Sequence, residues 1–137
     1  MSSDQAEGLV QVGEATVACE PAAPLAARTA VSQWLDGRAH SQMRDDACLL
    51  VSELVTNSLR HADQPPGAPV RIRTFALDSG VRVEVEDRGH GAVSRRANGG
   101  SGGFGLHLVE LLAARWGVSR EHGTLVWFEL TAPGPGR

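Results

Sequence analysis

The chain has 137 residues, of which 42% are hydrophobic and 21% charged, and its formal net charge is -3. This length and composition predict one folded domain with one hydrophobic core, and they exclude a wholly disordered chain. The two signs of charge are mixed along the chain without a long basic run, so we expect no direct binding to nucleic acid.

The sequence shows no pattern typical of a targeting signal. No apolar stretch approaches the ~18 residues that a membrane span needs. The first residues, MSSDQAEG, lack the basic and apolar segments of a signal peptide. We therefore expect a cytoplasmic protein without a membrane partner, whose Cys19 and Cys48 stay reduced in the core.

The first part of the chain predicts one strand and two helices. Residues 9–19 mix valines with polar residues in a strand-like pattern, and two prolines follow. Residues 25–35 place apolar side chains at helical spacing, and Asp36-Gly37 closes that helix. Residues 41–62 form the next predicted helix, with Ser41 as its N-cap. Its apolar stripe consists of Ala47, Leu50, Val51, Leu54, Val55, Ser58 and Leu59.

The second part predicts two hairpins and one more helix. After a proline-rich loop at 63–69, residues 70–75 and 81–86 alternate apolar side chains with mainly charged ones. This alternation predicts a hairpin with one buried and one solvated face. The glycine-rich residues 89–103 are expected to form a mobile loop, and residues 104–116, which end at Trp116, predict a second core helix. Residues 118–121 and 124–131 predict a last hairpin.

The order of these elements predicts the fold class. Helices interspersed with hairpins indicate an α+β protein of two layers, in which helices cover one face of a mixed, mostly antiparallel sheet. We expect a single domain at residues 9–131, with flexible ends at residues 1–8 and 132–137.

Four short segments contain residues that could carry chemistry. Glu53, Asn57 and His61 are spaced by four on the helix at 41–62, so they line up on one face. The other segments are the residues 87–91 (DRGHG) at a strand end, the glycines at 99–105 before a helix, and Gly123-Thr124. Taken singly, each has an ordinary explanation: a solvated helix face, a turn, a flexible linker and a plain strand residue.

Together, in this order and spacing, the four segments resemble the GHKL superfamily of ATP-binding domains, which have the Bergerat fold. The most similar group is the small bacterial anti-sigma factor serine/threonine kinases. Residues 53–62 (ELVTNSLRHA) resemble the N box of that family, and residues 87–91 its G1 box. Residues 103–106 (GFGL) resemble the G2 box, and residues 123–130 its closing strand. The resemblance covers roughly residues 25–130.

The resemblance implies that ATP and Mg²⁺ are bound, with distinct roles at the two ends of the nucleotide. At the phosphate end, Asn57 would ligate Mg²⁺ through its amide oxygen, and Glu53 would be the general base for an attacking hydroxyl. At the adenine end, Asp87 would accept a hydrogen bond from the exocyclic amine, and Thr124 would support the base. Gly89 and Gly91 would let the base approach the backbone.

The G2 box and the loop before it would enclose the phosphates. Gly103 and Gly105 would present backbone N–H groups to them, with Leu106 at the start of the helix. The loop at 92–102 would be the ATP lid, and Arg95 and Arg96 are candidate phosphate contacts in it. One departure from the family pattern is His90, a large residue inside the G1 turn.

Three functions compete at this point. The first, implied by the resemblance, is a kinase that phosphorylates an antagonist protein and sequesters a sigma factor, and that forms a homodimer as family members tend to do. The second is a nucleotide-dependent binding module without turnover, which would need no base at Glu53. The third, a stand-alone ATPase of the chaperone or topoisomerase kind, fits poorly because such proteins need further domains. The resemblance includes neither a histidine-phosphorylation domain nor a receiver domain, so we do not expect a complete sensor histidine kinase.

Overall fold

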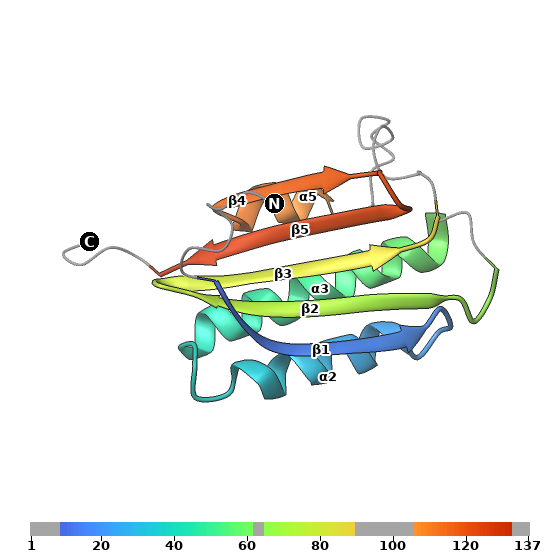
Figure 1. Ribbon diagram of the computed structural model, residues 1–137. Coiled ribbons are helices and arrows are strands. Elements are labelled where there is room, and N and C mark those ends of the chain that lie inside the picture. Colours follow the sequence, from blue (N-terminus) through green and yellow to red (C-terminus); the bar gives the residue numbers. More distant parts are fainter. Residues whose placement is uncertain (1–8, 62–64, 90–105, 133–137) are drawn as a thin grey trace.

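The computed structural model describes residues 9–61, 65–89 and 106–132. They form one sheet of five strands, in the order β1-β2-β3-β5-β4, with helices on one of its faces (Figure 1). In chain order the elements are β1 (Val10–Ala18), α2 (Ala23–Leu35), α3 (Ser41–His61), β2 (Pro69–Leu77), β3 (Gly80–Asp87), α5 (Leu106–Leu112), β4 (Arg115–Ser119) and β5 (Thr124–Thr131). The predicted α+β fold of two layers is confirmed. Every strand pairing in the described residues is antiparallel, so this sheet is not mixed.

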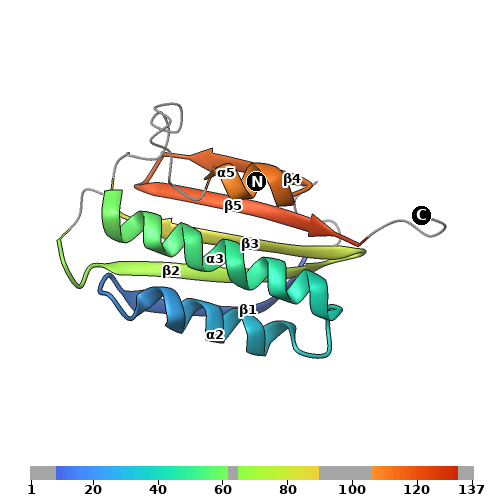
Figure 2. The ribbon, with the colours of Figure 1, turned by 180° about the vertical axis from the view of Figure 1, so that it is seen from behind.

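Helix α3 is the centre of the helical layer, and seen from behind it runs the length of the sheet beside α2 (Figure 2). The stripe predicted from its sequence is buried: Ala47, Leu50, Val51, Leu54 and Val55 are each exposed by 2% or less. These side chains meet the buried valines of the central strands. Full burial of one large aliphatic side chain contributes about 1.5–3 kcal/mol, so this contact fixes where α3 lies on the sheet.

The start of α3 differs from the prediction by one residue. The N-cap is His40, not Ser41: its Nδ1 accepts a hydrogen bond from the Met43 N–H at 3.3 Å, and its carbonyl accepts from the Arg44 N–H at 3.0 Å. An imidazole nitrogen is a competent acceptor, but serine is the commoner cap, which is why the sequence pointed to the neighbouring residue.

The predicted helix at 104–116 is too long. Helix α5 ends at Leu112, and β4 already begins at Arg115, three residues before the predicted strand. Trp116 continues the helical spacing of the leucines, but it lies in the strand opposite Phe128. The Ala114 N–H also donates to the Glu129 carbonyl at 2.8 Å. Pairing with β5 therefore overrides the local helical pattern.

Strand β1 carries a bulge between Gln11 and Gly13, which accounts for its imperfect alternation. The indole of Trp34 lies directly against Gly13, where an added Cβ would be 2.0 Å from the ring. Neither Cys19 nor Cys48 forms a disulfide, and both are buried, as predicted. Among the described helices, none combines the length and the apolar character of a membrane span.

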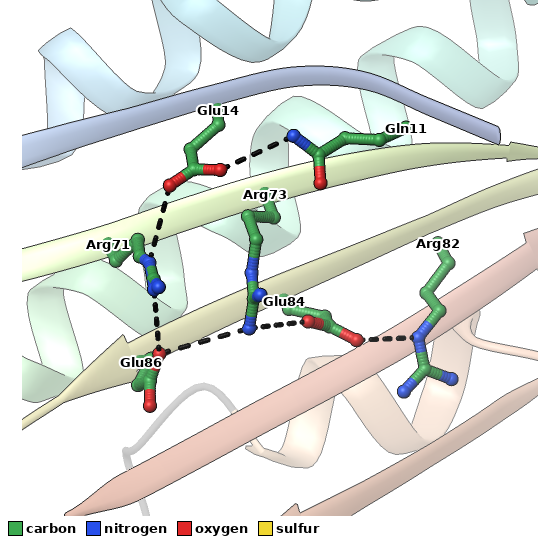
Figure 3. A network of polar contacts seen from close by, with 7 residues as sticks. All are labelled: Gln11, Glu14, Arg71, Arg73, Arg82, Glu84 and Glu86. Atoms are coloured by element: carbon green, nitrogen blue, oxygen red, sulfur yellow. Dashed lines mark hydrogen bonds and ion pairs between the residues drawn. The ribbon is translucent and has the colours of Figure 1, made fainter. Parts of the chain in front are cut away.

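The face of the sheet that no described helix covers carries a network of charged side chains (Figure 3). In this network Arg73 pairs with Glu84 at 3.0 Å, and Glu84 pairs in turn with Arg82 at 2.9 Å. Arg82 also pairs with Glu129 at 2.9 Å and stacks over the Trp127 ring at 4.1 Å. The polar positions of the predicted hairpin thus neutralise one another across neighbouring strands.

Candidate functional site

The first part of the site lies in the C-terminal half of α3, where Glu53 and Asn57 are one turn apart. Asn57 is 5% exposed, and its side-chain oxygen is buried without a hydrogen-bond partner among the described residues. An unsatisfied buried acceptor costs about 1–3 kcal/mol, so this oxygen is suited to a ligand that completes it. Glu53 is half-buried on the same side of the helix.

The second part of the site is Asp87, the last residue of β3. Strand alternation turns Asp87 toward the helices and its neighbour Glu86 toward the open face. Asp87 is 6% exposed, and both of its carboxylate oxygens accept hydrogen bonds. The Ser58 hydroxyl donates to Oδ2 at 2.6 Å, and the Gly89 N–H donates to Oδ1 at 2.8 Å. These donors offset the cost of burying a carboxylate and fix its orientation.

The third part of the site comes from the start of β5. Thr124 is paired in register with Asp87, is 3% exposed, and donates its hydroxyl to the Gly89 carbonyl at 2.8 Å. Gly123 has φ +98°, and an added Cβ would lie 2.3 Å from the Asp87 carbonyl oxygen. Only glycine fits this close approach, so the β4–β5 turn presses against the end of β3.

The structure therefore brings several predicted site residues together. Asp87, Gly89 and Thr124 are linked by hydrogen bonds at one end of the sheet. The Ser58 hydroxyl connects Asp87 to α3, one residue along the helix from Asn57. Sequence reasoning placed Ser58 in the apolar stripe and missed its role. The signal available was a single hydroxyl in an otherwise apolar stripe, next to a candidate metal ligand.

The remaining predicted residues are distributed differently. Leu106 is the first residue of α5 and belongs to the core, with 5% exposure. Gly91, Gly103 and Gly105 lie outside the described residues, together with the predicted lid at 92–102, its two arginines and His90.

The donor set fits Mg²⁺ held jointly with a nucleotide better than a metal held by protein alone. Residues 9–61, 65–89 and 106–132 contain no group of three or more His, Cys, Asp or Glu side chains that could hold a metal ion. The unpartnered oxygen of Asn57 is the hard ligand that Mg²⁺ prefers, and Mg²⁺ usually takes its remaining ligands from phosphates and water.

Two other features add no chemistry to this cluster. A cavity of about 390 Å³ borders the same strand end and includes Asp87 in its lining. Its other charged lining residues include Glu14, Arg71 and Glu86, and Arg71 pairs with both glutamates on the open face. On α3, burial raises the pKa of the Cys48 thiol, which donates to the Arg28 carbonyl at 3.6 Å. A thiol of raised pKa is a poor nucleophile, so we assign Cys48 no chemistry.

Comparison with known proteins identifies a family and a similar fold. The sequence profile of the family described as "Histidine kinase-like ATPase domain" matches residues 17–130. No curated protein sequence matches the chain. The fold is similar to the crystal structure of the RsbU and RsbW domains of Rv1364c from Mycobacterium tuberculosis, with a TM-score of 0.68 and 20% sequence identity.

That alignment covers 91% of this chain and 34% of the solved chain, so the protein spans about a third of the structure it matches. At this identity the likeness concerns the fold alone. The profile match extends from the end of β1 almost to the end of β5 and includes every described residue of the cluster. The chain belongs to the family of histidine kinase-like ATPase domains.

Proposed function

We propose that the protein is an ATP-dependent serine/threonine protein kinase that phosphorylates an antagonist protein and sequesters a sigma factor. One observation carries the proposal. Ser58 joins the buried carboxylate of Asp87 to the helix on which the Asn57 oxygen has no partner among the described residues. This arrangement therefore offers a carboxylate that can accept a hydrogen bond from a nucleobase and an amide oxygen that can bind a metal ion. The chain also belongs to a family of ATPase domains.

At the adenine end, the Asp87 carboxylate would accept a hydrogen bond from the exocyclic amine. A carboxylate accepts from an amino group and repels a carbonyl oxygen, so the same contact disfavours guanine. Gly89 and Thr124 hold the backbone beside it through their 2.8 Å hydrogen bond. Gly91 would extend this surface along the base.

At the phosphate end, Asn57 would hold Mg²⁺ through its unpartnered oxygen. Magnesium, when bound, would neutralise part of the phosphate charge. Gly103 and Gly105 would donate backbone N–H groups to the phosphates ahead of Leu106, as a helix N-terminus favours an anion.

The reaction assigned to Glu53 is proton removal from the acceptor hydroxyl. The hydroxyl oxygen of a serine or threonine in the antagonist bonds to the γ-phosphorus of ATP, ADP leaves, and Glu53 takes the hydroxyl proton. Because Glu53 and Asn57 share one side of α3, the base would lie beside the transferred phosphate.

The partners in this proposal rest on the resemblance of the four segments together, at residues 53–62, 87–91, 103–106 and 123–130, to the anti-sigma factor kinases. The proposal expects two protein partners, the antagonist and the sigma factor, and a homodimer of the chain. It expects no direct contact with nucleic acid. A nucleotide-dependent binding module would have the same partners but no phosphotransfer.

The test is transfer of labelled γ-phosphate from MgATP to the antagonist protein of the native cell. ATP affinity is measured by calorimetry in the same buffer, with GTP as the comparison. We expect ATP binding that needs Mg²⁺ and label on a serine or threonine of the antagonist. ATP binding without any label would favour the binding module, and no ATP binding would overturn the proposed function.

A further inference from the structure

Three side chains in the C-terminal half of α3 have hydroxyl groups, and one of them differs from the other two in its hydrogen-bond partner. The Ser52 hydroxyl donates to the Leu49 carbonyl at 3.0 Å, and the Thr56 hydroxyl donates to the Ser52 carbonyl at 2.8 Å. Both bonds stay inside the helix, which is the ordinary choice for serine and threonine in this position. The Ser58 hydroxyl instead leaves the helix and donates to Asp87 at 2.6 Å.

The surroundings of Ser58 make this bond a constrained one. Ser58 is 7% exposed and Asp87 is 6% exposed, so water competes little for either group. A hydrogen bond to a charged acceptor is about twice as strong as a neutral one. With the Gly89 N–H on the other oxygen, the carboxylate has donors on opposite sides and is held in one rotation.

The position of Ser58 next to Asn57 separates the two ends of the nucleotide. Consecutive residues of an α-helix point roughly 100° apart, so the two side chains face different neighbours. Asn57 carries the unpartnered oxygen, whereas Ser58 faces β3. Asn57 is therefore placed to bind the metal ion, and Ser58 is placed to orient the carboxylate that would bind adenine.

We propose that Ser58 is a positioning residue that sets the preference of the site for adenine over guanine. This inference rests on the proposed binding of ATP at Asp87. Ser58 acts through Asp87 and does not itself touch the base. Its hydroxyl keeps the carboxylate turned so that it accepts from an amine and repels a carbonyl at the same place. A carboxylate that loses this donor can rotate and take up water, which weakens both the attraction to adenine and the repulsion of guanine.

The experiment measures MgATP and MgGTP affinities by calorimetry for the wild type, Ser58→Ala, Ser58→Cys and Thr56→Val. We expect Ser58→Ala to lower ATP affinity by about tenfold, the scale of one lost hydrogen bond to a charged group, with GTP affinity unchanged or slightly raised. The ATP-to-GTP ratio should then fall by about the same factor. Ser58→Cys, which keeps a similar volume and a weaker donor, should give an intermediate ratio. Thr56→Val removes a hydroxyl from the same helix and should leave the ratio at the wild-type value.

The possible outcomes distinguish a failure of the proposed role of Ser58 from a failure of the proposed adenine binding at Asp87. A wild type that binds ATP no better than GTP would overturn the adenine assignment of Asp87 and the role of Ser58 with it. A wild type that prefers ATP, with an unchanged ratio in Ser58→Ala, would overturn the role of Ser58 alone. Equal losses of ATP and GTP affinity in Ser58→Ala would also overturn it, because they would reveal only a structural contribution.

Discussion

Carboxylates on the two faces of the sheet have different partners and different burial, and two adjacent residues of β3 show the contrast. Glu86 points to the open face, where it lies 3.8 Å from Arg73 and 4.0 Å from Arg71. Asp87 points to the helices and is held by Ser58 and Gly89. A carboxylate on the open face balances an arginine, whereas one on the covered face occupies a place where valines would contribute more to stability. The covered carboxylate is therefore the one that calls for a functional explanation.

The same contrast applies to how each face is stabilised. The covered face is apolar, and its largest fully buried side chain is Phe128. The open face is stabilised by a chain of linked ion pairs. The most buried of them joins Arg82 and Glu129, whose side chains are 13% and 11% exposed. Pairs nearer the edge are more exposed, and the Glu14 side chain is 44% exposed beside Arg71. The free energy of unfolding should therefore depend mainly on the packing of the covered face. The smaller contribution of the ion pairs on the open face should decrease as salt concentration rises.

The largest expected effect is on stability, from matched phenylalanines on the two faces. Phe128→Ala should lower the free energy of unfolding by about 3–5 kcal/mol, because it empties a fully buried position. Phe75→Ala, at a half-buried position on the open face, should cost clearly less. Urea unfolding followed by circular dichroism measures both. Equal losses would mean that the open face is covered in solution.

The next effect is on nucleotide binding, from the adjacent carboxylates of β3. Asp87→Ala should weaken MgATP binding by about 1.5–3 kcal/mol, through loss of a hydrogen bond between the base and a charged acceptor. Glu86→Ala is the control and should leave affinity nearly unchanged, because Glu86 faces the arginines. Calorimetry on the two variants and the wild type gives the comparison. An unchanged affinity in Asp87→Ala would remove the adenine contact from the account.

How much of this could be predicted from the sequence differs between the two faces. The alternation of valines with charged residues in β3 correctly placed Glu86 outside and the apolar residues inside. The stripe of α3 likewise predicted its buried side. The bond between Ser58 and Asp87 could not be predicted, because it joins residues far apart in sequence and depends on where α3 lies along β3.

Local patterns failed where tertiary pairing decided the outcome. Trp116 has the spacing of a helical residue, yet the pairing of β4 with β5 draws it into a strand. The cap of α3 depended on the orientation of the His40 ring, which residue preferences do not indicate. The glycine motifs at 103–105 were predicted from the resemblance and stay predictions, because they lie outside the described residues.

The smallest expected effect belongs to the exposed edge of the open face. Glu14→Gln removes one charge from the 3.4 Å pair with Arg71, whose side chain is 38% exposed. We expect a loss of less than about 1 kcal/mol in unfolding free energy at low salt, and a smaller loss at 1 M salt. Unfolding of the variant and the wild type at both salt concentrations tests this. A loss that does not depend on salt would show that packing, and not charge, holds this edge.

The central claim is that Glu53 and Asn57, in the C-terminal half of α3, are the residues that make phosphotransfer possible. Replacing the two residues separately tests this claim most directly. Asn57→Ala should weaken Mg²⁺-dependent ATP binding and phosphotransfer together, because it removes the proposed metal ligand. Glu53→Gln keeps the shape but removes the base. It should leave ATP affinity nearly intact while transfer of labelled γ-phosphate to the antagonist falls by roughly 10²–10⁴-fold. Transfer by Glu53→Gln at the wild-type rate would contradict the account.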